Sequence, residues 1–217
     1  MAKLLEAVHS TAVLDTHVHF AADDDDPALP EYRKVMRAAR DGDVFETGSR
    51  DGLVGWTNKI AVRRAGEYRF LASLGDDMTP RTPGWDARLA RAIDEMGGTG
   101  FAYPWDGIRE DIPEAVVMSS DIVAALGWMA NPALAHFWID NTWADLGKGA
   151  GCLRYLRAVA VDHNHYVTGK AKADATYGDA AGRIPADKAA YEKWRAERMA
   201  DDVAVIRALR ERSLQPA

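Results

Sequence analysis

The segment S-L-G-D-D-M-T-P-R-T-P-G-W-D (Ser73–Asp86) decides how this chain is interpreted. The apolar run Tyr68–Leu74 leads into it and predicts a buried strand that stops at Gly75. Two carboxylates, Asp76 and Asp77, follow at once. Charged groups at the end of a buried strand are costly unless they are paired or bind a cation. Because Mg²⁺ is typically held by one or two carboxylates and by substrate phosphates, this pair predicts a site for a metal and a diphosphate. The alternative is a polar turn that caps the next segment.

Other expected strands also end in polar residues. The run Ala12–Ala22 alternates like a strand and enters an aspartate run, Phe137–Ile139 leads to Asp140, and Val159–Val161 leads to His163. In open α/β sheets, ligands bind just outside the carboxyl ends of the strands. These strand ends therefore predict a cleft along one edge of a mixed sheet, within a single α/β domain of residues 1–217. Helices are expected between the strands, and residues 186–212 predict one C-terminal amphipathic helix.

The composition excludes several classes of protein. The chain has 217 residues, 47% of them hydrophobic, and a net charge of −6, which gives no global attraction to nucleic acid. Residues 1–145 hold 14 Lys and Arg against 24 Asp and Glu, whereas residues 146–217 hold 13 against 9. No apolar run reaches the ~18–20 residues of a membrane span. The single cysteine, Cys152, excludes an internal disulfide, so a cytoplasmic protein without a membrane partner is expected.

The histidines after Val161 are candidate metal ligands. His163 and His165 would point the same way on a strand. With the aspartates they could hold Mn²⁺ or Mg²⁺ together with phosphate oxygens. A pair of surface histidines near a turn is the alternative.

Asp140 is the candidate general base. It lies in F-W-I-D-N-T-W, and a carboxylate among tryptophans is partly desolvated, which raises its proton affinity. A helix cap, or a buried partner for Arg or Lys, is the alternative. The chain has seven tryptophans, of which we expect two at most to contact a ligand, since most tryptophans are core residues.

The motif D-T-H-V-H (Asp15–His19) suggests a different chemistry. It matches the D-x-H-x-H opening of metal-dependent amidohydrolases. In this chain the strand is expected to continue beyond the histidines, and the length is short for an eight-unit barrel of ~250 residues. An amidohydrolase-type metal hydrolase is therefore the more remote hypothesis.

Taken in order, several segments resemble GT-A glycosyltransferases, and in particular a small inverting type common in bacteriophage and viral metagenomes. The likeness covers roughly Val13 to Trp194. The matching segments are A-D-D-D-D-P with Tyr32, Gly52–Val54 with Asn58, L-G-D-D-M-T-P-R-T-P-G-W-D, S-S-D-I-V-A-A-L-G-W, H-F-W-I-D-N-T-W-A-D-L-G and D-H-N-H-Y-V-T-G-K-A-K-A-D-A-T-Y. The resemblance implies a Rossmann-like GT-A domain that binds a nucleotide-diphosphate sugar, most simply a UDP-sugar.

The resemblance also implies a role for each matching residue. Asp77, alone or together with Asp76, corresponds to the D-x-D-type metal element, and His163 or His165 to the late histidine ligand. Asp140 corresponds to the base that deprotonates the acceptor. The donor pocket would be formed by Asp23, Asp24, Asp25, Asn58, Asp76 and Trp85.

One departure concerns the start of the fold. Family members begin with a strand and a T-R-G-R-P-like loop, whereas this chain begins inside the following helix. The usual first strand is therefore expected to be absent, either because the gene start is truncated or because another segment fills the gap.

The resemblance implies two acceptor classes. One is 5-hydroxymethylcytosine in phage DNA, modified in the cytoplasm of an infected bacterium, and the other is a virion protein or a cell-surface glycan. The basic C-terminal third favours DNA slightly. The basic residues concerned are Lys148, Arg154, Arg157, Lys170, Lys172 and Arg183.

Overall fold

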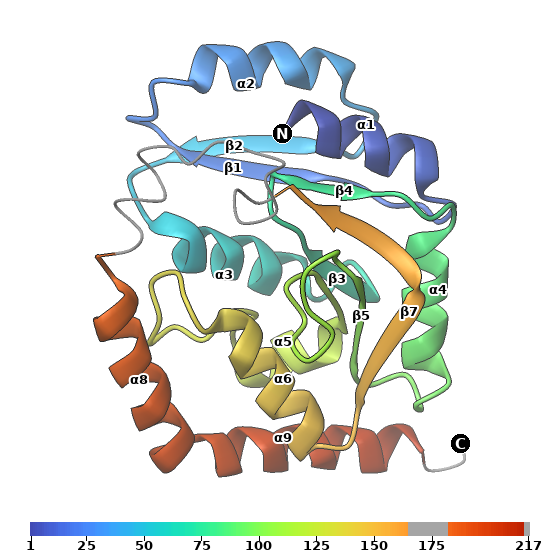
Figure 1. The fold of residues 1–217 in the computed structure, drawn as a ribbon, viewed down its shortest axis with the longest axis vertical. Coiled ribbons are helices and arrows are strands. Elements are labelled where there is room, and N and C mark those ends of the chain that lie inside the picture. Colours follow the sequence, from blue (N-terminus) through green and yellow to red (C-terminus); the bar gives the residue numbers. More distant parts are fainter. Residues whose placement is uncertain (165–181, 215–217) are drawn as a thin grey trace.

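The chain folds into two sheets flanked by helices (Figure 1). The computed structural model describes residues 1–164 and 182–214. Its strands are β1 (His19–Asp23), β2 (Val44–Gly48), β3 (Phe70–Ser73), β4 (Met78–Pro80), β5 (Phe101–Trp105), β6 (Val116–Ser119) and β7 (Leu153–His163). Five of them form a mixed sheet in the order β3-β6-β5-β7-β4, and β1 and β2 form a separate parallel pair. The expected α/β class with a mixed sheet is confirmed.

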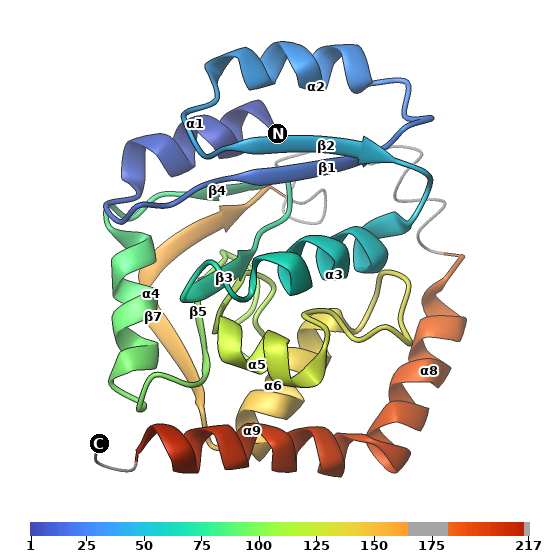
Figure 2. The ribbon, with the colours of Figure 1, turned by 180° about the vertical axis from the view of Figure 1, so that it is seen from behind.

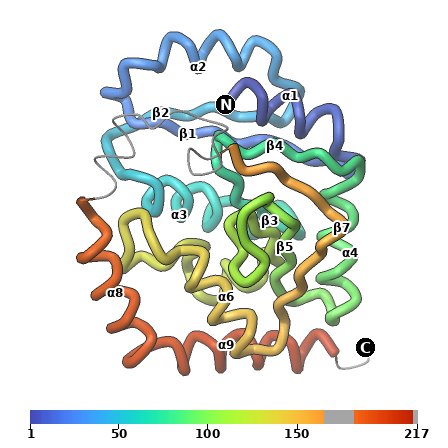
Figure 3. The backbone as a smooth tube through the Cα atoms, viewed as in Figure 1, coloured from blue at the N-terminus to red at the C-terminus, as the bar shows by residue number. Residues whose placement is uncertain are grey.

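Helices cover both faces of the larger sheet, as Figures 2 and 3 show. The described helices are α1 (Ala2–Thr11), α2 (Leu29–Val35) with a 3₁₀ turn (Met36–Ala38), α3 (Gly52–Arg64), α4 (Trp85–Asp94), α5 (Ser120–Leu126), α6 (Ile139–Gly149), α8 (Ile184–Glu197) and α9 (Met199–Ser213). Helix α4 packs on β5, β6 and β7, while α5 and α6 contact β6, β7 and the outer helix α9. In the described residues no helix has the combined length and apolarity needed to cross a bilayer.

The core lies around the centre of the larger sheet. Phe101 of β5 and Val116 of β6 are fully buried, and so is Val161 of β7. Strands that are covered by helices on both faces are apolar throughout instead of alternating, which explains why these runs were recognisable in the sequence.

The structure corrects three sequence-based expectations. The strand expected over Ala12–Ala22 begins only at His19, because the Asp86 carboxylate accepts the backbone N–H groups of Val13 (3.1 Å) and Leu14 (2.8 Å) before the strand starts. No strand forms at Phe137–Ile139. There the buried Asp187 carboxylate accepts the N–H groups of residues 135, 136 and 137 at 2.8–2.9 Å, which holds this backbone outside the sheet.

The third correction concerns the C-terminal helix expected over residues 186–212, which is two helices, α8 and α9. The chain leaves helical geometry at Arg198, with φ −128°. The indole N–H of Trp194 donates to the Asp202 carboxylate at 2.8 Å across this corner. Both side chains are buried, so the corner is part of the core.

Candidate functional site

The centre of the candidate site is His163, which lies between two carboxylates. β4 pairs with β7 in an antiparallel register that places Met78 opposite His163, so the preceding residue, Asp77, reaches the imidazole. Asp77 Oδ2 lies 3.2 Å from His163 Nε2, and Glu114 Oε2 lies 2.7 Å from Nδ1. Asn164 fixes this end of the strand pair, because its backbone N–H and its side-chain amide donate to the Asp77 carbonyl at 3.1 and 2.6 Å.

These neighbours determine the charge of the imidazole. Burial alone would lower the pKa of His163, but the hydrogen bonds and negative charges of Asp77 and Glu114 outweigh burial and raise that pKa to about 9. The His163 side chain is 15% exposed. At neutral pH the cluster is therefore an imidazolium between two carboxylates.

Asp140 is the second candidate residue. It lies in the first turn of α6, where its Oδ1 accepts the Asn141 N–H at 2.9 Å. Burial raises the pKa of Asp140, and the negative charge of Glu114 acts in the same direction, while the charge of Arg109 opposes it. Trp138, at the N-cap of α6, is the only non-glycine residue in the described part of the chain with positive φ (62°). Such a backbone conformation is uncommon for a bulky residue and is often found at functional sites.

One cavity of about 1150 Å³ brings these groups together. The part of its wall around His163, called here the polar end, includes carboxylates from four separate parts of the sequence. We define this end by His163 and by the carboxylates Asp23, Asp26, Asp76, Asp77, Glu114 and Asp140. The rest of the wall is formed mainly by β1, β3 and α3.

The aspartate run contributes only part of its length to the cavity. Asp23 lines it and accepts the Trp56 indole N–H at 2.8 Å and the Asp51 N–H at 3.1 Å. Although burial opposes ionisation, these hydrogen bonds lower the pKa of Asp23. Asp24 and Asp25 are exposed and do not line the cavity, and Asp25 forms an ion pair with Arg50 at 2.9 Å.

Two further candidates for the donor pocket have structural roles. Asn58 does not line the cavity; its Oδ1 accepts the N–H groups of Met129 (2.8 Å) and Ala130 (2.9 Å), and its Nδ2 donates to the Ala130 carbonyl (2.8 Å). Trp85 borders the cavity from the core and is 2% exposed. Asp76 is 77% exposed, and its carboxylate lies 3.7 Å from the amino group of Met1.

The donor set of the cluster fits a divalent ion. A metal-bound histidine normally donates its other ring N–H to a carboxylate, which is the relation of His163 to Glu114. Within residues 1–164 and 182–214, however, no group of three or more His, Cys, Asp or Glu side chains is arranged to hold a metal. A metal bound by Asp77 and His163 would therefore take its other ligands from phosphate oxygens and water. The second predicted histidine, His165, lies outside the described residues.

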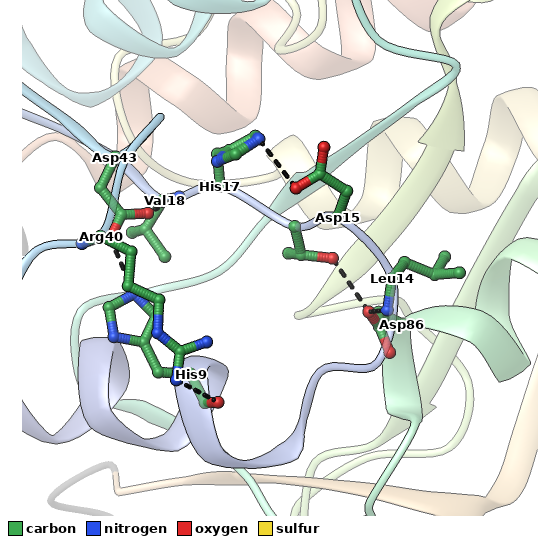
Figure 4. A network of polar contacts seen from close by, with 9 residues as sticks. His9, Leu14, Asp15, His17, Val18, Arg40, Asp43 and Asp86 are labelled. Carbon is green, nitrogen blue, oxygen red and sulfur yellow. Dashed lines mark hydrogen bonds and ion pairs between the residues drawn. The ribbon is translucent and has the colours of Figure 1, made fainter.

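Residues of the D-T-H-V-H motif take part in a network of polar contacts (Figure 4). His17 Nε2 lies 3.3 Å from Asp15, whereas His19 Nε2 lies 2.9 Å from Glu46 on the neighbouring strand. Asp43 joins this region to α1, because it accepts the Val18 N–H and contacts His9, both at 2.7 Å. The strands described here form open sheets and not the eight-stranded barrel of the amidohydrolase hypothesis.

The basic residues expected to meet DNA are largely paired with the protein itself. Arg154 lies 3.7 Å from Glu95, and Arg157 lies 3.5 Å from Glu110. Lys148 donates to the carbonyl of Asp111 at 3.2 Å. Lys170 and Lys172 lie outside the described residues.

Glu114 is the functional candidate that sequence reasoning missed. It follows Pro113 in the loop between β5 and β6, outside any periodic pattern. The only sequence feature that marks Glu114 is its position directly before the apolar run Ala115–Met118. Comparison of the chain with protein-family models and with curated protein sequences finds no match.

Proposed function

We propose that this protein is a metal-dependent glycosyltransferase that moves a sugar from a nucleotide-diphosphate sugar, most simply a UDP-sugar, to an acceptor hydroxyl. The observation that carries the proposal is the Asp77–His163–Glu114 cluster, which opens into the same cavity as Asp140. Metal ligands and a carboxylate of raised pKa in one large cavity are the parts that such a transfer needs. The GT-A resemblance of the sequence supports the same chemistry.

Asp77 and Nε2 of His163 would hold Mn²⁺ or Mg²⁺, and the bound ion would offset the charge of the departing diphosphate. Glu114 keeps the proton on Nδ1, so Nε2 is the nitrogen that becomes available to the ion. Because His163 is protonated at neutral pH, loading the site would release a proton.

Asp140 is the proposed base. Its burial raises its proton affinity, and Asn141 and the Trp138 cap fix its position at the start of α6. It would take the proton of the acceptor hydroxyl as the oxygen attacks the anomeric carbon from the face opposite the diphosphate. In-line attack of this kind inverts the anomeric configuration.

The acceptor we propose first is 5-hydroxymethylcytosine in DNA, which would have to leave the base stack to reach the cavity. One observation favours a second candidate, the hydroxyl of a glycan or a virion protein. Arg154 and Arg157, which were expected to meet phosphates, have acidic partners in the protein.

The test is a transfer assay with Mn²⁺, a panel of nucleotide sugars, and either hydroxymethylated DNA or a glycan array as acceptor, read by mass spectrometry. Asp77→Asn should abolish metal-dependent transfer. The matched control is Asp201→Asn, an exposed carboxylate in the first turn of α9. Transfer that survives excess chelator, or that is undiminished in Asp77→Asn, would overturn the proposal.

A further inference from the structure

The loop that leads into Asp140 is held by a helix from a distant part of the sequence. Asp187 lies in the first turn of α8 and is 3% exposed. Its Oδ1 accepts the N–H group of Ala135 at 2.9 Å, and its Oδ2 accepts those of His136 (2.9 Å) and Phe137 (2.8 Å). Figures 1 and 2 show α8 beside this loop. One carboxylate of α8 therefore binds three successive N–H groups of the loop.

These three hydrogen bonds explain how the Asp187 carboxylate can be buried. A buried charge is costly unless it is compensated, and N–H groups that donate to a carboxylate stabilise its ionised form. Hydrogen bonds to an ionised group are also stronger than those between neutral groups. The carboxylate therefore fixes the backbone of residues 135–137 more firmly than a neutral side chain of the same shape would.

The next residue, Trp138, has a backbone conformation that is uncommon for a bulky residue, with φ 62°. Such a conformation persists only where the surrounding structure fixes it. On the amino side of Trp138, Asp187 holds residues 135–137. On the carboxyl side, the Trp138 carbonyl accepts the N–H group of Thr142 (3.0 Å) and its hydroxyl (2.9 Å), and Thr142 is fully buried. Trp138 is thus held between α8 and the first turn of α6.

The conformation of Trp138 sets the direction in which α6 begins. Asp140 comes two residues after Trp138, and Ile139 between them is buried. Rotation about the Trp138 backbone would turn the start of α6 and, with it, the Asp140 side chain. His136, Phe137 and Trp138 line the same cavity as Asp140. The segment of residues 135–138 therefore also forms the wall beside this carboxylate.

The rings of this segment pack against one another. The ring centroids of His136 and Phe137 lie 4.8 Å apart with the planes at 66°, and those of Phe137 and Trp138 lie 6.2 Å apart at 69°. Edge-to-face contacts of this kind are favourable. All three side chains are half-buried. A wall of packed rings limits the access of water to Asp140, and burial is the main cause that raises the pKa of Asp140.

We propose that Asp187 is a positioning residue for Asp140: its carboxylate fixes the segment of residues 135–138, and this segment determines the place and the surroundings of the candidate base. Asp187 itself does not line the cavity, so it acts through the segment and not on a ligand. The proposal rests on the proposed function only in that Asp140 is taken as the base.

A second contact of α8 provides the matched control. The Tyr191 hydroxyl, one turn after Asp187, donates to the Asp145 carboxylate of α6 at 2.7 Å. This bond also joins α8 to α6, but it involves no residue of the segment. If α8 were only an outer support, loss of either contact would have the same consequence for Asp140.

The test compares Asp187→Asn with Tyr191→Phe, first by amide hydrogen exchange measured by NMR. An asparagine side chain has a single oxygen and cannot accept all three N–H groups, which in the original protein are shared between two oxygens. At least one amide of residues 135–137 should therefore exchange about tenfold faster or more in Asp187→Asn. These amides should be unchanged in Tyr191→Phe.

The second measurement is the pKa of Asp140, from NMR titration of labelled aspartate carboxyl groups, with the resonance assigned through Asp140→Asn. Asp187→Asn should lower this pKa toward its ordinary value, because a loosened segment admits water to the carboxylate. The charges of Glu114 and Arg109, which also act on Asp140, are the same in both variants. Tyr191→Phe should leave the Asp140 pKa unchanged.

An unchanged Asp140 pKa in Asp187→Asn would overturn the proposal. The same shift in Tyr191→Phe would also overturn it, because docking of α8 would then be the cause. If Asp187→Asn failed to fold while Tyr191→Phe folded, Asp187 would be a structural residue and the proposal would again be wrong.

The transfer assay gives a third measurement. Asp187→Asn should lower kcat by about tenfold or more, because a misplaced base is less effective, and should leave KM for the nucleotide sugar unchanged. Lack of transfer by the original protein would overturn the proposed function. Amide exchange and the Asp140 pKa would in that case still decide the role of Asp187.

Discussion

The two ends of the cavity are built differently. At the polar end, ionisable side chains from distant parts of the sequence pair with one another, as His163 does with Asp77 and Glu114. At the apolar end, the strand edges of β1 and β3 have no neighbour in the described structure. The polar end is thus organised by side-chain charge, while β1 and β3 each pair on one side only among the described strands. Changes at the polar end should therefore alter chemistry and pH dependence, and changes at the apolar end should cost less stability than equivalent changes in the closed core.

The largest effect is expected from Asp140→Asn. This change keeps the shape and removes the base, and a general base contributes ~10²–10⁴-fold in rate. Transfer should fall by that factor, while nucleotide-sugar binding, measured by calorimetry, persists. The stability of the protein should not decrease, because burial already disfavours the ionised form of Asp140. Near-normal transfer by this variant would remove Asp140 from the mechanism, and Asp201→Asn controls for loss of a first-turn carboxylate.

A pair of phenylalanine truncations compares the closed core with the apolar end. Phe101 is fully buried in the five-stranded sheet, so Phe101→Ala should lower the free energy of unfolding by about 3–5 kcal/mol. Phe20 of β1 is only half-buried, so Phe20→Ala should cost about 1–2 kcal/mol, in proportion to the smaller apolar area that it buries. Urea unfolding of the two variants measures both losses of unfolding free energy. Equal losses would show that the apolar end packs as tightly as the core.

Strand β3, which ends at Ser73 shortly before Asp76 and Asp77, and the end of β7 at His163 could be predicted from the sequence, because each is an apolar run followed by polar residues. The α/β class followed from the same runs. The prediction of a strand at Phe137–Ile139 was wrong because the carboxylate of a distant residue, Asp187, accepts hydrogen bonds from the backbone there. Local sequence propensity carries no information about such a contact. Glu114 was missed for a related reason, since its contact with His163 joins residues that are 49 positions apart in the sequence.

The charge of the polar end predicts a pH dependence of stability. The pKa of His163 is about 9 in the folded protein and 6.5 ordinarily, so the folded state binds the proton more tightly. The stabilisation is fully present below about pH 6.5 and is lost as the pH rises through 9. It amounts to about 3.5 kcal/mol at most, at about 1.4 kcal/mol per pKa unit.

His163→Gln tests this dependence. It should flatten the decline of the unfolding free energy between pH 6.5 and 9, measured by urea unfolding without added metal. Glu114→Gln should shift the decline to lower pH, because one of the two carboxylates that hold the proton is gone. An unchanged profile in both variants would show that the imidazole is not protonated between the carboxylates.

A small effect is expected at Asn58, which ties α3 to the loop before Asp140. Asn58→Ala leaves the N–H groups of Met129 and Ala130 and the Ala130 carbonyl without their partner. Because the site is only partly buried, water can replace some of these bonds, and the cost should be about 1–3 kcal/mol. Asn58→Asp keeps the acceptor for both N–H groups but loses the donor, so it should cost less than the alanine variant. If both variants unfold like the original protein, the loop is held by the packing of Trp143, whose indole N–H donates to the Met129 carbonyl at 2.7 Å. If instead Asn58→Ala lowers transfer far more than stability, the amide acts through the position of Asp140 and couples the helix that lines the apolar end to the chemistry of the polar end.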